Sequence, residues 1–350
     1  MSEAQAITPA QQQIEFLPFE QQIFARSPFG IVTTTVVIFV LFFGTFLVVA
    51  GVEHVAIVRP GFAPTGASWP AVVLSLVCCA ALGMQRYVRV AEARDAPAYT
   101  KILTGGAASV GRVTSMGAPE ARLGRATSIG LLVGLAISAI VGVSESQEGH
   151  PIPPLMLVWF TFVTTFMVVL FTRGVEQTRS GSRAYARMLA AELKIDLLRT
   201  DTLAVLGRSA ARSSLIWFVV SAVAFLFLVG GDLNWLTSIL IVACAAMGIM
   251  QFAVVMSRVH KLIMQAKSQE LEHIRRQIEM QRSTMATDDH AATRLHGLLA
   301  YEKRITEAPE WPFDQTTLLR VGASTLILTV PWFGQAIAAY VVDHLSHFAG

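Results

Sequence analysis

Long stretches without charged residues recur along this chain and alternate with polar segments. Seven such windows, each 19 to 26 residues long, lie between consecutive charged residues. A helix needs roughly 20 apolar residues to cross the hydrocarbon core of a bilayer, which is about 30 Å thick. The windows predict spanning helices at Gly30–Val52, Trp69–Met84, Thr127–Val143, Leu155–Phe171, Ser214–Gly230, Trp235–Met256 and Val321–Val342.

The pattern predicts an all-α, polytopic transmembrane bundle of six to seven spans. No stretch alternates apolar and polar residues in the way that transmembrane strands do. The seventh window contains Pro331, with Trp332 and Gly334 close by, so this segment either crosses with a kink or folds back. The composition, 53% hydrophobic and 15% charged, agrees with a membrane protein.

The positions of Lys and Arg predict the orientation, because cytoplasmic loops retain these residues. With the N-terminus inside and a crossing at each window, 26 of the 27 basic residues lie on the cytoplasmic side and only Arg59 lies outside. We therefore predict a multi-pass inner-membrane protein with a cytoplasmic N-terminus. Basic segments beside spans favour contact with anionic lipid, and nothing in the pattern requires nucleic acid.

The windows divide the chain into alternating membrane and cytoplasmic segments. The outside loops are too short to fold into a domain, and no signal peptide precedes the first span. The predicted segments are a cytoplasmic N-terminal segment (1–29), spans one and two (30–84), a cytoplasmic loop (85–126), spans three and four (127–171), a cytoplasmic region with an amphipathic helix at Ser182–Leu198 (172–213), spans five and six (214–256), a cytoplasmic helical hairpin (257–317), and span seven with a tail (318–350).

The cytoplasmic hairpin is predicted from two apolar stripes that are separated by the polar residues Thr287–Asp289. The first stripe continues the sixth span at intervals of seven, three, four and seven residues, which is a heptad seam. The second stripe belongs to the returning helix. The first contains Met264, Leu271, Ile274, Ile278 and Met285, and the second contains Ala292, Leu295, Leu299 and Ile305.

Small residues recur at every fourth position of the third span, at Gly130, Gly134, Ser138 and Gly142. Such a face lets two helix backbones approach closely, which is a main source of packing energy between helices in lipid. The sequence predicts a helix-packing face here. The partner is another span of the same subunit or a span of a second copy, and the pattern leaves both open.

Threonines of the fourth span, Thr161, Thr164 and Thr165, offer hydroxyl groups that a polar conduit could use. A threonine in a lipid-embedded helix more often bonds a carbonyl of its own preceding turn. No Asp, Glu, Lys, Arg or His lies inside any of the seven predicted spans, which argues against proton relays, ion-coupled transport and voltage sensing. A passive pore remains compatible with this pattern.

Catalytic and cofactor motifs are absent from the sequence. The Gly-rich segment 104–111 lacks the Lys-Ser or Lys-Thr of a phosphate-binding loop. Cys78, Cys79 and Cys244 lie inside spans, and His344 and His347 lie in a C-terminal tail. We therefore predict no enzyme, cofactor or metal site. Two functions stay open: a scaffold or signalling subunit that binds a cytoplasmic protein or assembles with itself, and an oligomeric passive channel.

Three short segments carry a resemblance to a known family. They are Ile195–Leu198 before a basic helix, and Glu310–Asp314 and Leu318–Arg320 before the last apolar segment. They are similar to segments in a family of uncharacterised bacterial polytopic inner-membrane proteins. The resemblance covers the C-terminal half, and it implies the membrane topology and a bacterial origin.

Overall fold

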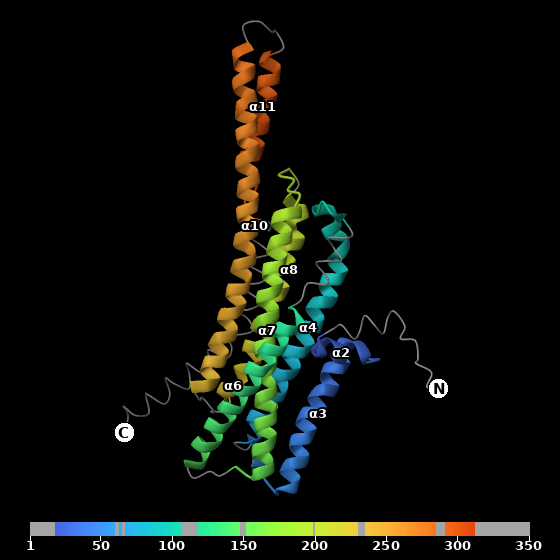
Figure 1. Cartoon of the computed structure of the whole chain (residues 1–350), viewed down its shortest axis with the longest axis vertical. Helices are drawn as coiled ribbons and strands as arrows, with labels where there is room; N and C mark the ends of the chain where they lie inside the picture. Colours follow the sequence, from blue (N-terminus) through green and yellow to red (C-terminus); the bar gives the residue numbers. More distant parts are fainter. Residues whose placement is uncertain are drawn as a thin grey trace, which may run out of the picture.

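Helices make up nearly all of the regular structure in this computed structural model (Figure 1). One exception is a pair of two-residue antiparallel strands, β1 (Val58–Arg59) and β2 (Ala63–Pro64). The all-α prediction is confirmed. The structure describes residues 18–59, 63–64, 67–106, 118–147, 152–198, 200–229, 235–284 and 291–311.

The helices follow the predicted alternation of apolar and polar segments, and several are much longer than a bilayer requires. They are α2 (Phe19–Arg26), α3 (Ile31–Val52), α4 (Ser68–Ile102), α6 (Glu120–Gln147), α7 (Pro154–Glu192), the short 3-10 helix η1 (Thr200–Leu203), α8 (Ala204–Ala224), α9 (Leu226–Val229), α10 (Trp235–Thr284) and α11 (Ala291–Glu307).

Five of the described helices are long and apolar enough to cross a membrane, namely α3, α4, α6, α7 and α10. The predicted count of six to seven spans is therefore not confirmed. The predicted span Ser214–Gly230 is divided between α8 and α9, because the helix is interrupted at Phe225. The indole Nε1 of Trp69 donates a hydrogen bond to the Leu226 carbonyl beside this interruption, at 2.7 Å. The predicted span Val321–Val342 lies outside the described residues.

Helix α7 continues past the predicted membrane boundary without a break. The predicted separate helix at Ser182–Leu198 is instead the last part of α7, which ends at Glu192. No proline interrupts residues 172–192, and the Arg, Glu, Gln and Ala residues of this stretch favour helix. Met188 and Leu189 are buried there, so tertiary packing supports the continuation.

Contacts from other elements fix α7 at its two ends. At its start, the Glu53 carboxylate accepts hydrogen bonds from the backbone N–H groups of Leu155 and Met156, at 2.6 and 3.0 Å. These are donors that a helix N-terminus leaves unpaired. At its end, Leu193 pairs with Leu103, which follows α4. The 39-residue helix is therefore held from outside at both ends.

Two large clusters of buried apolar side chains, and a small third one of Ala210, Val255 and Met256, form the core. The larger cluster joins α3, α4, α7, α8 and α10, with Phe46, Leu82 and Met156 among its most buried members. The second cluster, called the junction core below, gathers the ends of α4 and α7 with the start of α8 and the middle of α10. The junction core contains Tyr99, Ile102, Leu103, Met188, Leu189, Leu203, Val205, Leu206, Val259 and Ile263.

Candidate functional site

The hairpin of α10 and α11 extends beyond every other described helix (Figure 1). The two helices pack against each other along this projection. Ile263 is the last residue of α10 in the junction core, and α10 continues from there to Thr284. At 1.5 Å per residue, this projection is about 31 Å long.

Along α10, only the first residue of the predicted stripe departs from the prediction among the described positions. Ile263 is buried, whereas the predicted Met264 is exposed. Ile274 is buried, as the stripe requires, and Leu271 and Ile278 are half-buried. Met285 lies outside the described residues.

On α11, two of the four predicted residues depart from the stripe. Ile305 is buried, but Leu299 is exposed and its neighbour Leu298 is half-buried. Ala292 is also exposed, and Leu295 is half-buried. Buried and half-buried positions recur at steps of three and four residues on both helices, which is the spacing of a heptad seam.

Lys267 is a buried member of the seam that the apolar pattern did not reveal. Its side chain is 7% exposed, and the ammonium donates to the carbonyls of Thr306 and Ala308 at 2.7 and 3.1 Å. It also contacts the Glu310 carboxylate at 3.3 Å. Because a helix C-terminus carries unpaired carbonyls, this lysine caps the end of α11.

Further polar contacts join the two helices above and below Lys267. Arg275 pairs with Glu302 at 2.9 Å, and the Tyr301 hydroxyl donates to Glu270 at 3.1 Å. Desolvation and the bond to this carboxylate raise the pKa of Tyr301 above its usual value. The His260 ring stacks on Trp311, with ring centroids 4.3 Å apart. Polar pairs therefore supply much of the contact in the hairpin.

The small residues of α6 face α7. A Cβ added to Gly130 would lie 2.8 Å from the Val169 Cα, and one added to Gly134 would lie 2.6 Å from the Thr165 Cα. Ser138 is buried on the same face. Gly142 is less confined, since an added Cβ would meet only the end of the Leu157 side chain, at 3.2 Å. These four residues contact a helix of the same chain.

Thr165 lies in this interface, because its backbone and side chain are the atoms that approach Gly134. Its hydroxyl has no hydrogen-bond partner within the described part of the chain. Thr161 and Thr164 are half-buried. The structure therefore brings Thr165 into helix packing.

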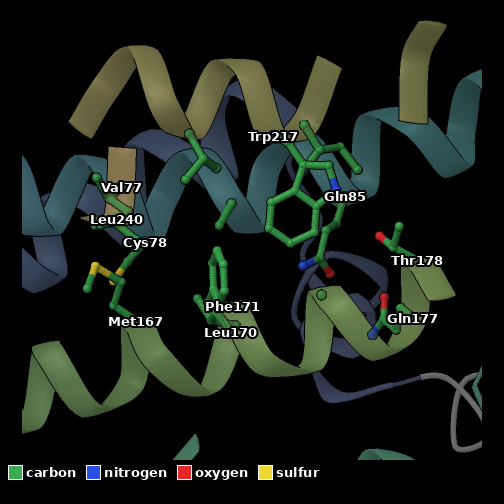
Figure 2. A pocket seen from close by; sticks show the side chains of 14 residues that line it. Val77, Cys78, Gln85, Met167, Leu170, Phe171, Gln177, Thr178, Trp217 and Leu240 are labelled. Atoms are coloured by element: carbon green, nitrogen blue, oxygen red, sulfur yellow. The ribbon is translucent and has the colours of Figure 1, made fainter. Parts of the chain in front are cut away.

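A partly open pocket with a cavity volume of about 60 Å³ lies between α4, α7, α8 and α10. Figure 2 shows Gln85, Gln177 and Thr178 at one end of the pocket, and Val77, Cys78, Met167 and Leu240 at the other. Trp217 and Phe171 lie between the two ends. The apolar pattern did not reveal this pocket. Gln85 and Gln177, which follow predicted spans, were the available signal.

The described residues contain no group of three or more His, Cys, Asp or Glu side chains that could hold a metal. His344 and His347 lie outside these residues. The three cysteines are buried and unpaired with one another. The geometry thus offers two candidate sites, the projecting hairpin and the pocket.

Five long apolar helices indicate an integral membrane protein. No family model, curated protein or solved structure matches this chain, so the resemblance to bacterial inner-membrane proteins stays a prediction.

Proposed function

We propose that this chain is a non-enzymatic scaffold or signalling subunit of the bacterial inner membrane, which binds a cytoplasmic protein through the α10–α11 hairpin. The projection of about 31 Å beyond the junction core carries this proposal. A paired-helix projection presents long faces that a partner can contact, as helices do in many recognition complexes.

The charge distribution supports a cytoplasmic hairpin. The basic ends of α4 and α7 and the hairpin lie at the same end of the bundle (Figure 1), and Leu103 and Leu193 join the first two. The end of α3, the end of α6 and the start of α7 lie at the opposite end. Positive residues stay on the cytoplasmic side of a bilayer, so the hairpin end faces the cytoplasm.

The hairpin surface supports partner binding rather than independent folding. Away from the seam, Met280 and Leu299 are 61% and 47% exposed. Two packed helices of this length bury little apolar surface and gain most of their stability from tertiary contacts. The contacts at Val259 and Ile263 give the base of the hairpin such support, and the projecting part has surface left for a partner.

Photocrosslinking in cells tests this proposal directly. A photoreactive amino acid at Met280 or Leu299 is expected to give one discrete adduct with a cytoplasmic protein. Ile249 and Val254 are matched controls, because they are exposed on α10 within or next to the predicted span. They are expected to give no such adduct.

Two further results would overturn the proposal. Absence of any protein adduct from the hairpin positions would remove the partner. An adduct of twice the chain mass would assign the hairpin to self-association. A deletion variant provides a further control. Residues 272–302 are replaced by a short Gly-Ser linker, which retains Lys267 and the Thr306 and Ala308 carbonyls that it contacts. With the photoreactive amino acid placed at Met264 instead, this deletion should abolish the adduct.

The alternative function is an oligomeric passive channel. The contact of Thr165 with α6 uses this residue in helix packing, so it gives no specific support to a pore. Conductance of the purified protein in planar bilayers separates the two functions. Reproducible single-channel steps that change in the Thr161→Leu and Thr165→Leu variants would establish the channel and replace the scaffold.

A further inference from the structure

The pocket between α4, α7, α8 and α10 has one polar end and one apolar end, as a lipid molecule does. Its apolar end is lined by Val77, Met167 and Leu240, and its polar end by the amides of Gln85 and Gln177 (Figure 2). The eight residues from Val77 to Gln85 give α4 a rise of about 12 Å along the pocket. A ligand that fills it therefore has one polar end and one apolar end.

The polar end lies where the predicted spans end. Gln85 immediately precedes Arg86, and Gly174, which also lines the pocket, follows Arg173. These arginines are the first charged residues after two of the apolar windows. A bound amphiphile would therefore stand with its head at the membrane boundary and its chain toward the bilayer interior, as membrane lipids do.

Three buried polar atoms at this end have no hydrogen-bond partner within the described residues. They are Gln85 Oε1, Gln177 Nε2 and Trp217 Nε1. Gln85 and Trp217 are only 9% and 4% exposed. Both approach Gly174, since a Cβ built there would lie 3.4 Å from Trp217 Cη2 and 3.9 Å from Gln85 Nε2. Buried polar groups are nearly always paired, so these three call for an external partner.

The unpaired set consists of one acceptor and two donors. Gln85 Oε1 can accept one hydrogen bond, and Gln177 Nε2 and Trp217 Nε1 can each donate one. A hydroxyl group is the complement, because it donates once and accepts twice. No Asp, Glu, Lys, Arg or His is among the residues that line the pocket. A charged head would have no counter-charge there, so the set favours a neutral ligand.

We propose that this pocket binds a neutral lipid with a free hydroxyl, of the acylglycerol or long-chain alcohol class. The hydroxyl donates to Gln85 and accepts from Gln177 and Trp217, and one apolar chain lies along Val77 and Met167. This inference does not depend on a partner for the hairpin. Failure of one proposal leaves the other intact, because the part of the hairpin that projects beyond Ile263 contributes no residue to the pocket.

Photolabelling of the purified full-length chain in nanodiscs tests the pocket. The probe is a monoacylglycerol with a diazirine in its acyl chain, and the labelled peptides are identified by mass spectrometry. The adducts are expected on the α4 and α7 segments that line the pocket. Unlabelled dodecanol should compete, and methyl dodecanoate should compete about five- to tenfold less well, because it lacks the donor hydrogen.

Matched variants separate the pocket from general lipid contact. Gly174→Leu fills the polar end and should reduce labelling at least about tenfold, whereas Gly181→Leu should leave it unchanged, because a Cβ at Gly181 meets no atom within 4 Å. Gln85→Leu removes the unpaired acceptor. It should reduce labelling about five- to tenfold without lowering the thermal midpoint of the lipid-free protein.

Several results would overturn the proposal. Equal labelling of the wild type and Gly174→Leu would place the lipid elsewhere. Competition by dodecanoate alone would show that the head is charged. If Gly174→Leu does not fold, two other measurements test the pocket: competition by dodecanol and methyl dodecanoate with the wild type, and labelling of the Gln85→Leu variant. Equal potency of dodecanol and methyl dodecanoate would then refute the hydroxyl contact.

Discussion

Glu20 of α2 and Arg173 of α7 form a buried ion pair with two hydrogen bonds. Arg173 Nε donates to one carboxylate oxygen and Nη2 to the other, the latter at 3.0 Å. Arg173 also donates to the Thr127 hydroxyl at 2.9 Å, and its guanidinium lies 4.6 Å from the centroid of the Phe19 ring. This arrangement fixes the N-terminal helix, α6 and α7 to one another at the predicted membrane boundary.

Removal of one partner of this pair should destabilise the fold strongly. Glu20→Leu leaves the Arg173 charge buried without compensation, and we expect a loss of roughly 3 to 5 kcal/mol. Thermal unfolding in detergent micelles measures the change. The double variant Glu20→Leu/Arg173→Leu should recover part of the loss, because no unpaired charge remains.

The pair between Arg122 and Glu176 is the control for this experiment. Its atoms are 3.9 Å apart and the Arg122 side chain is 46% exposed, so Arg122→Ala should cost about 1 kcal/mol or less. If Glu20→Leu cost no more than Arg122→Ala, the buried pair would have no special role in stability.

The packing face of α6 predicts a graded series of alanine variants. Gly134→Ala should destabilise by about 1 to 3 kcal/mol, because the new Cβ meets the α7 backbone. Gly142→Ala should cost less, since only the end of Leu157 must move. Gly44→Ala meets no atom within 4 Å and should be neutral or stabilising, as alanine favours helix.

Thermal midpoints in one detergent give the order of the three variants. Gly134→Leu and Val133→Leu extend the series, because Val133 is exposed on the same helix. Equal tolerance of leucine at the two positions would show that α6 and α7 do not pack closely through Gly134.

The cap at the end of α11 predicts a local effect of Lys267→Met. Methionine keeps the apolar stem but loses the ammonium, and we expect α11 to lose about 1.5 to 3 kcal/mol of protection. Hydrogen exchange of the residue 300–308 amides measures it. Lys303→Met is the control, because Lys303 is exposed and its pair with Glu307 is long, at 3.9 Å. Similar exchange in the two variants would exclude a capping role.

The seventh crossing can be tested by labelling of introduced cysteines. The native cysteines are buried, which keeps the background low. We expect Ser283→Cys, near the end of α10, to react only from the cytoplasm, and Ser346→Cys to react only from outside. Labelling of Ser346→Cys from the cytoplasm alone would mean that Val321–Val342 enters and leaves the bilayer on the same side.

The apolar windows predicted where the long helices lie, because the thickness of a bilayer sets the minimum length of apolar sequence in a spanning helix. They did not predict that α7 continues as one helix to Glu192, whereas the continuation of α10 was predicted from the heptad seam. The windows record only the contact with lipid, whereas the extensions are stabilised by the junction core, whose members Tyr99, Leu189 and Ile263 are far apart in the sequence.

The candidate sites were harder to predict for the same reason. Glu20 and Arg173 are separated by 153 positions, and no local pattern links them. From the sequence alone, Lys267 is expected to be a solvated charge beside an apolar stripe. Its contact with the end of α11 follows only from the tertiary structure. The polar end of the pocket depends on Gln85, Gln177 and Trp217 from three helices, and their burial follows only from tertiary packing.

The length of α7 and its two fixed ends have a mechanical consequence. Its 39 residues form a rod of about 58 Å, which is nearly twice the thickness of the hydrocarbon core. Glu53 holds one end and the strand-like pairing of Leu193 with Leu103 holds the other. Met188 and Leu189 of α7 share the junction core with Val259 and Ile263 of α10, so a change in the tilt of α7 would displace the base of the hairpin as well.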